Sequence, residues 1–134
     1  MSKLRYDIGR LFMNTVVRDM LKSFSEGKDD LARAYKNETA GIVNMLDEIY
    51  KKNHLDVKTK ELICVAISTY ARTEYGIVCH AYKAFEANAT KDEIMEAGFL
   101  ATACGGETAL TYMVTLLKEC VEEFEKDFKN KKRI

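Results

Sequence analysis

The sequence predicts an all-α protein with a single domain, and three observations favour this fold class. The chain has 134 residues, which is the usual size of one domain. It has no proline and only seven glycines, a composition that disfavours the many tight turns of an all-β fold. Its apolar residues recur at helical spacing along most of the chain. We therefore expect one domain over residues 1–134, folded as a six-helix bundle.

Residues 1–52 are expected to form two N-terminal helices. An apolar stripe over residues 4–24 keeps the three- and four-residue spacing of one helix face. Residues 25–28 include a glycine and are expected to break this first helix. A second stripe over residues 31–49 predicts another helix, which should end near Lys51 and Lys52 because lysines suit the last turn of a helix.

Two further helices are expected over about residues 57–71 and 75–87. Asp56 is a suitable N-cap for the first of them. The centre of this helix, residues 62–67, is apolar all round, which is typical of a helix buried on several sides. Asn88 follows the second helix and is expected to end it, because asparagine tolerates the left-handed conformation at a helix C-terminus.

The last two expected helices begin and end with clear local signals. Thr90 and Glu93 have the spacing of a capping box, which predicts the start of a fifth helix. This helix should end near Cys104, where two glycines follow. A sixth helix is predicted from the apolar stripe over residues 110–128, and the basic tail at 129–134 is expected to be solvated.

Charge and cysteine content exclude several functional classes. The 21 basic and 21 acidic residues give a net charge of zero, so neither nucleic acid nor a membrane is an expected partner. No uncharged run approaches the roughly 20 residues of a membrane span, and no signal peptide is apparent, so we expect a cytoplasmic protein. The four cysteines form no Cys-x-x-Cys pair, and no metal is expected. Three of them have apolar neighbours that predict buried thiols, namely Cys64, Cys104 and Cys120.

Two polar side chains stand out within this core-building pattern. Glu61 lies in the second turn of the third expected helix, where it either belongs to a site or only complements the helix dipole. His80 lies on the fourth helix and is either a structural or exposed histidine, or an acid–base partner for a nearby carboxylate. Cys79 is next to His80 in sequence, but neighbouring helical residues point about 100° apart, so adjacency does not make a reactive pair. The other histidine, His54, is expected in an exposed loop.

Residues 55–124 resemble the carboxymuconolactone decarboxylase and alkylhydroperoxidase D-like superfamily. The matching features are the run LDVKTKELI at residues 55–63, His80 ahead of a helix stop, the run ANATKDEIMEA at residues 87–97, and the pair Gly105 and Gly106. The resemblance implies the all-α fold of the alkylhydroperoxidase D-like type. It also implies assembly with other copies of the chain as a homotrimer or hexamer.

The resemblance assigns roles to several positions. Redox members use a glutamate, a Cys-x-x-Cys pair and a following histidine, and these positions fall here on Glu61, on Thr73 with Gly76, and on His80. Both thiols are absent, so the dithiol–disulfide cycle is not available in its usual form. Cys79 lies one turn beyond Gly76 and is the remaining candidate for a single reactive thiol.

The lyase branch of the family, which also lacks the cysteine pair, gives the preferred hypothesis. It implies an acid–base enzyme that removes CO2 from a small carboxylated substrate with no cofactor, with His80 as the acid and Glu61 orienting it. Lys83 or Arg72 would supply a cation for the carboxylate, and the substrate site would include Thr73 and Gly76. Two alternatives stay open: a thiol antioxidant that uses Cys79, and a non-catalytic member that binds a small ligand or serves as an oligomeric scaffold.

Overall fold

The structure, a computed structural model, describes the backbone of residues 2–129 and the side chains of residues 15–129. All the regular structure within this range is helical, which confirms the all-α class. The helices α5, η1 and α6 follow one another without a loop, so the described chain forms five continuous helical segments instead of six separate helices. The elements are α1 (Ser2–Ala34), α2 (Lys36–Tyr50), α3 (Val57–Ala71), α4 (Glu74–Glu86), α5 (Lys91–Tyr112), the π-helical turn η1 (Met113–Leu117) and α6 (Lys118–Phe128).

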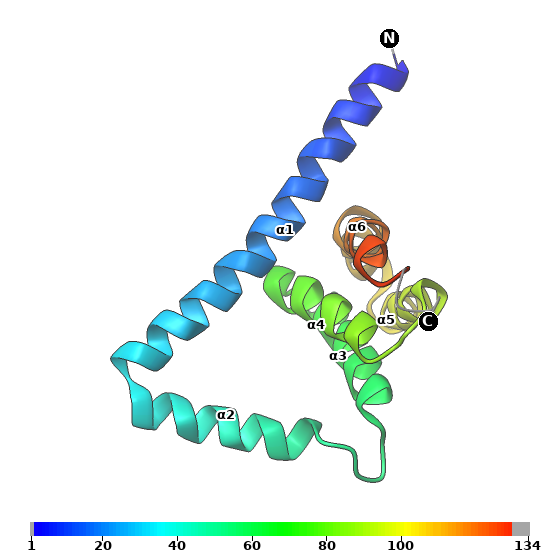
Figure 1. Cartoon of the computed structure of the whole chain (residues 1–134). Helices are drawn as coiled ribbons and strands as arrows, with labels where there is room; N and C mark the ends of the chain where they lie inside the picture. The colour runs from blue at the N-terminus through cyan, green and yellow to red at the C-terminus, as the bar shows by residue number, and fades with distance from the viewer. Residues whose placement is uncertain (1, 130–134) are drawn as a thin grey trace.

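The helices form a packed body and an open frame (Figure 1). In the body, α3 packs against α4 and α5, and α6 packs against α4. The N-terminal helices α1 and α2 form two sides of a triangle that is closed by α3 and α4 (Figure 1). The first part of the predicted stripe at residues 4–24 and most of the basic tail lie outside the described side chains. The core is made of fully buried apolar side chains, among them Val17, Val65, Ile77, Ile94, Leu117 and Phe124.

An ion-pair cluster holds α1 against the packed body. The guanidinium of Arg18 donates to Glu123 at 2.7 Å and to Asp127 at 2.9 Å, and both acceptors are on α6. Glu123 is buried, so the hydrogen bond from Arg18 replaces an interaction that its carboxylate loses with water. Desolvation raises the pKa of Glu123, but the hydrogen bonds from Lys126 and Arg18 outweigh it and hold this pKa below its ordinary value.

Three predicted helix-end signals are confirmed. The Asp56 side chain caps α3 by accepting from the backbone N–H of Thr59 at 2.7 Å. The capping box of α5 is complete: the Glu93 amide donates to the Thr90 hydroxyl at 3.1 Å, and the Glu93 carboxylate accepts from the Thr90 amide at 2.8 Å. Asn88 follows α4 with a φ of 66°, so asparagine occupies the left-handed position that was expected to end this helix.

The predicted break at residues 25–28 is wrong, because α1 continues to Ala34. A glycine in a helix costs only about 1 kcal/mol relative to alanine, which the rest of a long helix can offset. An ion pair between Lys22 and Glu26, at 3.7 Å, also supports the turn before Gly27. The chain leaves the helix at Tyr35, where φ is −132° and ψ is 66°.

The predicted end of the fifth helix near Cys104 coincides with a break in its backbone: α5 extends to Tyr112 as one element, but Gly106 within it is non-helical and separates two helical parts. Gly106 has φ 65° and ψ −152°, a conformation that is essentially restricted to glycine. The glycine pair therefore interrupts the helix where the sequence predicted its end. Cys104, predicted to be buried, is exposed just before this break.

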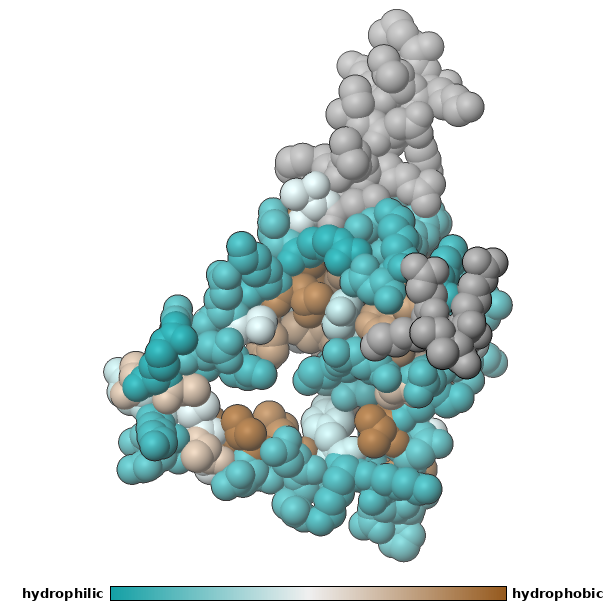
Figure 2. Space-filling view, in the orientation of Figure 1, coloured by the Kyte–Doolittle hydropathy of each residue, from teal (hydrophilic) through white to brown (hydrophobic). Residues whose placement is uncertain are grey.

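Many apolar side chains of this chain are exposed. The centre of α3 was expected to be buried on several sides, but Ile63 is 43% and Ile67 is 59% exposed. Cys64 is half-buried, whereas Cys120 is buried as predicted. In α2 the only buried residue is Thr39. Figure 2 shows hydrophobic side chains along the edges of the opening between the frame and the packed body. No helix among the described residues is both long and apolar enough to cross a membrane.

Candidate functional site

Glu61 and His80 meet between α3 and α4. The second turn of α3 carries Glu61, and α4 carries His80 in its middle. His80 Nδ1 and Glu61 Oε2 are 2.7 Å apart, so the imidazole donates its Nδ1–H to the carboxylate. Glu61 is buried, with 4% of its surface exposed, whereas the His80 side chain retains 20%. The pair thus combines a buried carboxylate with an imidazole that solvent can reach.

Tyr50 and Cys64 complete the surroundings of this pair, and the sequence analysis did not single out Tyr50. The Tyr50 ring, at the end of α2, stacks on His80 with centroids 6.1 Å apart and an interplanar angle of 20°. Tyr50 Oη and Cys64 Sγ are 3.0 Å apart. Burial raises the pKa of Tyr50, and its contact with Cys64 and the charge of Glu61 raise it further, so the phenol stays neutral at pH 7.

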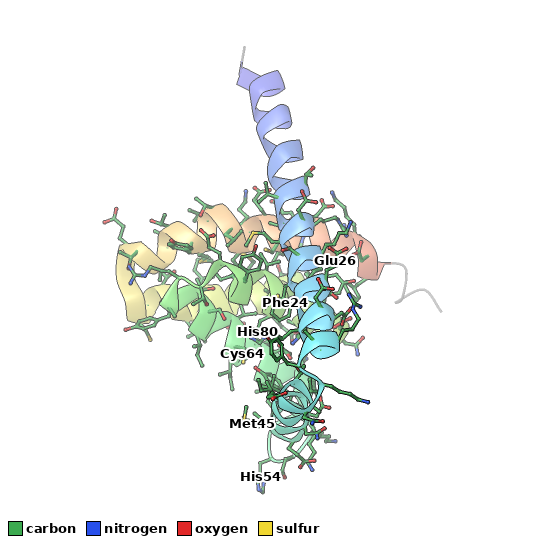
Figure 3. All side chains as sticks on the ribbon, turned by 90° about the vertical axis from the view of Figure 1, so that its left-hand side faces the viewer. Phe24, Glu26, Met45, His54, Cys64 and His80 are labelled. Carbon is green, nitrogen blue, oxygen red and sulfur yellow. The ribbon has the colours of Figure 1, made fainter. Side chains whose placement is uncertain are left out.

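A cavity of about 410 Å³ opens beside the pair and is lined by residues of α1, α2, α3 and α4. Glu61 and Tyr50 are both on its wall, whereas His80 contacts both of them but is not itself one of the residues that line the cavity. Lys83 lies on the same wall, with its Nζ 5.8 Å from the centroid of the Tyr50 ring. Figure 3 looks onto the frame of α1 and α2, with His80 and Cys64 labelled on the helices behind it. The cavity thus places a cation near the carboxylate–imidazole pair.

Cys79 faces a different cavity from the one that contains Glu61. It is 6% exposed and lies on the wall of a cavity of about 700 Å³ between α1 and α4. Burial raises the pKa of Cys79, although the positive charges of Lys83 and Lys28 oppose this effect. The thiol is therefore mostly protonated at pH 7, which lowers its reactivity as a nucleophile.

Arg72, Thr73 and Gly76 are not on the walls of the two cavities described above. Arg72 is exposed and ends α3 with a φ of 60°. The Thr73 hydroxyl donates to the carbonyl oxygen of Ser68 at 3.4 Å. Gly76 packs closely on Ser68, because a Cβ at this position would lie 2.8 Å from the Ser68 hydroxyl. Roles in substrate binding for these three residues stay predictions.

The chemistry that this arrangement supports is proton transfer. A carboxylate that holds Nδ1–H of an imidazole fixes its orientation and tautomer, and stabilises the positive charge when the ring takes up a second proton. Among residues 15–129, Nε2 of His80 has no protein hydrogen-bond partner, so this nitrogen can give or take a proton. Within the same residues, no group of three or more His, Cys, Asp or Glu side chains is placed to hold a metal ion.

Fold and site together define an all-α protein with a buried carboxylate–imidazole pair between two central helices. The sequence model of the Carboxymuconolactone decarboxylase family matches residues 38–119, which is more than half of the chain. The chain belongs to this family. The match includes Glu61, Cys79, His80 and Lys83, and it leaves out all of α1. No curated protein matches the chain.

Three solved structures are similar to this chain. A carboxymuconolactone decarboxylase family protein from Legionella pneumophila has a TM-score of 0.73 and 25% identity, over 84% of this chain and 97% of its own. A family protein from Thermotoga maritima, for which a part in antioxidative response has been suggested, has a TM-score of 0.65 and 29% identity, over 81% and 94%. A protein from Burkholderia xenovorans LB400 supports the fold alone, with a TM-score of 0.66 and 24% identity over 86% and 98%.

Proposed function

We propose that the protein is an acid–base enzyme that decarboxylates a small carboxylated substrate, with His80 as the acid and Glu61 as the residue that positions it. The observation that carries this proposal is the 2.7 Å contact between His80 Nδ1 and Glu61 Oε2 beside a cavity. Membership of the Carboxymuconolactone decarboxylase family supports a lactone acid as the substrate class. The lyase branch that the chain resembles uses no metal or organic cofactor, and the proposal needs none.

The proposed step is a loss of CO2 followed by protonation. The bond between the substrate carbon and its carboxylate breaks, CO2 leaves, and the electron pair stays on the substrate as a carbanion or enolate. Nε2–H of the protonated His80 then delivers its proton to this carbon, while Glu61 stabilises the imidazolium before the transfer. Water reprotonates the imidazole afterwards, so the net reaction consumes one proton and releases one CO2.

Lys83 is the proposed partner for the substrate carboxylate. Its ammonium lies on the cavity wall near Tyr50, and no described carboxylate pairs with it. Such a cation offsets the repulsion between Glu61 and an anionic substrate. The site must also release the product after CO2 has left. The substrate loses one negative charge in the reaction, which weakens the attraction between the product and Lys83.

Incubation with 4-carboxymuconolactone tests the reaction directly. We expect the wild-type protein to release CO2, and we expect Glu61→Gln to lower the rate by about 10- to 100-fold, because the amide no longer stabilises the imidazolium. The matched control is Glu107→Gln, a change of the same kind at an exposed position of α5, which should leave the rate unchanged. If the wild-type protein and Glu61→Gln release CO2 equally slowly, the proposal is wrong.

The antioxidant alternative depends on Cys79, and the suggested role of the Thermotoga maritima relative is the observation in its favour. The raised pKa of the thiol counts against it, since a protonated sulfur attacks peroxide slowly. Peroxide turnover that is lost in Cys79→Ser would support this alternative over decarboxylation. A protein that performs neither reaction would support the non-catalytic alternative, a ligand-binding or scaffold member.

We also propose that the chain assembles with copies of itself, as a homotrimer or hexamer. Several large apolar side chains are more than half exposed in the single chain, which is costly in water. On α2 alone, Ile42 is 53%, Met45 is 54% and Ile49 is 55% exposed. A 15-residue helix with so little buried surface gains most of its stability from packing, so a second copy is the proposed cover for this face.

Sedimentation equilibrium at micromolar protein concentration tests the assembly. We expect a mass of three or six times the 15.3 kDa of the single chain. Ile42→Glu should shift this distribution towards the single chain, because the new charge would be buried at the interface. A wild-type mass of 15.3 kDa over the whole concentration range would refute the assembly.

A further inference from the structure

Two cavities lined by α1 and α4 share a wall. The cavity of about 700 Å³ lies between α1 and α4, and the cavity of about 410 Å³ contains Glu61. Helix α1 supplies two of the residues that line both of them, and α4 supplies the other two. The shared residues are Phe24, Lys28, Lys83 and Glu86.

The cations around the α1–α4 cavity differ in whether they have a partner. Arg18 is bound by Glu123 and Asp127, and Lys22 pairs with Glu26 at 3.7 Å. Neither Lys28 nor Lys83 has a carboxylate within ion-pair distance among the side chains of residues 15–129. The charges of both these ammonium groups act on the Cys79 thiol on the cavity wall, so both are near the same part of this cavity.

The wall that the two cavities share has a net charge of +1, which favours a ligand group with one negative charge. Lys28 and Lys83 contribute two positive charges, and Glu86 contributes one negative charge. Asp47 and Glu61 lie on the wall of the smaller cavity only and add negative charge there. An anion is therefore favoured on the side of the α1–α4 cavity, where apolar surface is also available from Leu21, Phe24 and Tyr82.

We propose that Lys28 and Lys83 together form a binding site for one carboxylate of a ligand with an apolar body. Of these two lysines, only Lys83 was expected from the sequence as a cation for the substrate carboxylate. Lys28 comes from α1, outside the residues that the family model matches. The ammonium groups bind the carboxylate from two helices, and Phe24 contacts the apolar body. That this ligand is the substrate rests on the proposed decarboxylation. That the two lysines bind a carboxylate does not depend on that proposal.

Titration of the full-length protein with benzoate and with uncharged benzamide, followed by NMR, tests this site. We expect Lys28→Met to raise the Kd of benzoate by about tenfold, since it removes one charged partner and keeps the apolar stem. The Kd of benzamide should not change. Glu86→Gln should lower the Kd of benzoate several-fold, because it removes the opposing charge. The matched control is Lys36→Met, an exposed lysine at the start of α2 that lines neither cavity.

Three results would overturn the inference. These are a benzoate Kd that Lys28→Met leaves unchanged, equal weakening of benzoate and benzamide, and no benzoate binding by the wild-type protein. The titration needs no turnover, so it separates the two proposals. A Lys28-dependent Kd without CO2 release would refute only the decarboxylation, and CO2 release with a Lys28-independent Kd would refute only this site.

Discussion

Replacing His80 with alanine is expected to lower kcat for decarboxylation by about 10²- to 10⁴-fold, the usual contribution of a positioned acid. The change removes the proton donor and leaves Glu61 buried without the only hydrogen-bond partner that the described chain gives it. Because the substrate carboxylate is held by other groups, KM should change far less than kcat. The measurement is CO2 release over a range of 4-carboxymuconolactone concentrations.

His54→Ala is the matched control for this experiment, because His54 lies in the exposed loop between α2 and α3. It should leave both kcat and KM unchanged. Added imidazole should restore part of the rate to His80→Ala, since a free imidazole can enter the space that the side chain leaves. It should restore none to Glu61→Gln, in which the imidazole ring is still present. A His80→Ala protein with wild-type kcat would exclude His80 as the acid.

Phe124→Ala is expected to lower the free energy of unfolding by about 3–5 kcal/mol. Phe124, on α6, is fully buried, and its ring meets Tyr82 of α4 edge-on at 5.1 Å between centroids. The guanidinium carbon of Arg18 also lies 5.8 Å from the centre of the Phe124 ring, so the residue joins α1, α4 and α6. The alanine variant would leave a cavity at this junction. Urea-induced unfolding followed by circular dichroism measures the loss.

Phe99→Ala is the control for this prediction, since Phe99 is 61% exposed on α5. In the dissociated chain it should change the free energy of unfolding by less than about 0.5 kcal/mol. A larger cost that grows with protein concentration would indicate that a second copy covers Phe99. If Phe124→Ala costs less than about 1 kcal/mol, the junction of the three helices is not the packed centre described above.

The features that the sequence predicted well are those set by neighbouring residues or by a spacing that the family shares. Asp56 needs only Thr59 to cap α3, and the capping box of α5 lies within four residues. The resemblance placed Glu61 and His80 at the positions of a catalytic pair, and the structure brings them to 2.7 Å. Such local and spaced patterns can be read from one chain because they do not depend on the path of distant segments.

The features that could not be predicted depend on packing between distant segments. Tyr50 reaches His80 only because α2 returns along the triangular frame, and Lys28 reaches the cavities only because α1 continues past Gly27. A local pattern treats a glycine as a break, whereas the helix as a whole tolerates its small cost. The exposure of Ile67 was missed for a related reason, since an apolar pattern does not distinguish a buried helix face from an exposed one.

The close packing at the start of α4 limits which side chains residue 76 can carry. By the resemblance, Gly76 falls on one of the positions where redox members carry a thiol, and a Cβ there would lie 2.6 Å from the hydroxyl oxygen of Thr73 and 2.8 Å from that of Ser68. A single mutation to cysteine would therefore strain the helix contact before it could restore sulfur chemistry. A dithiol at positions 73 and 76 would therefore require the Ser68 side chain of α3 to turn away or to be replaced as well.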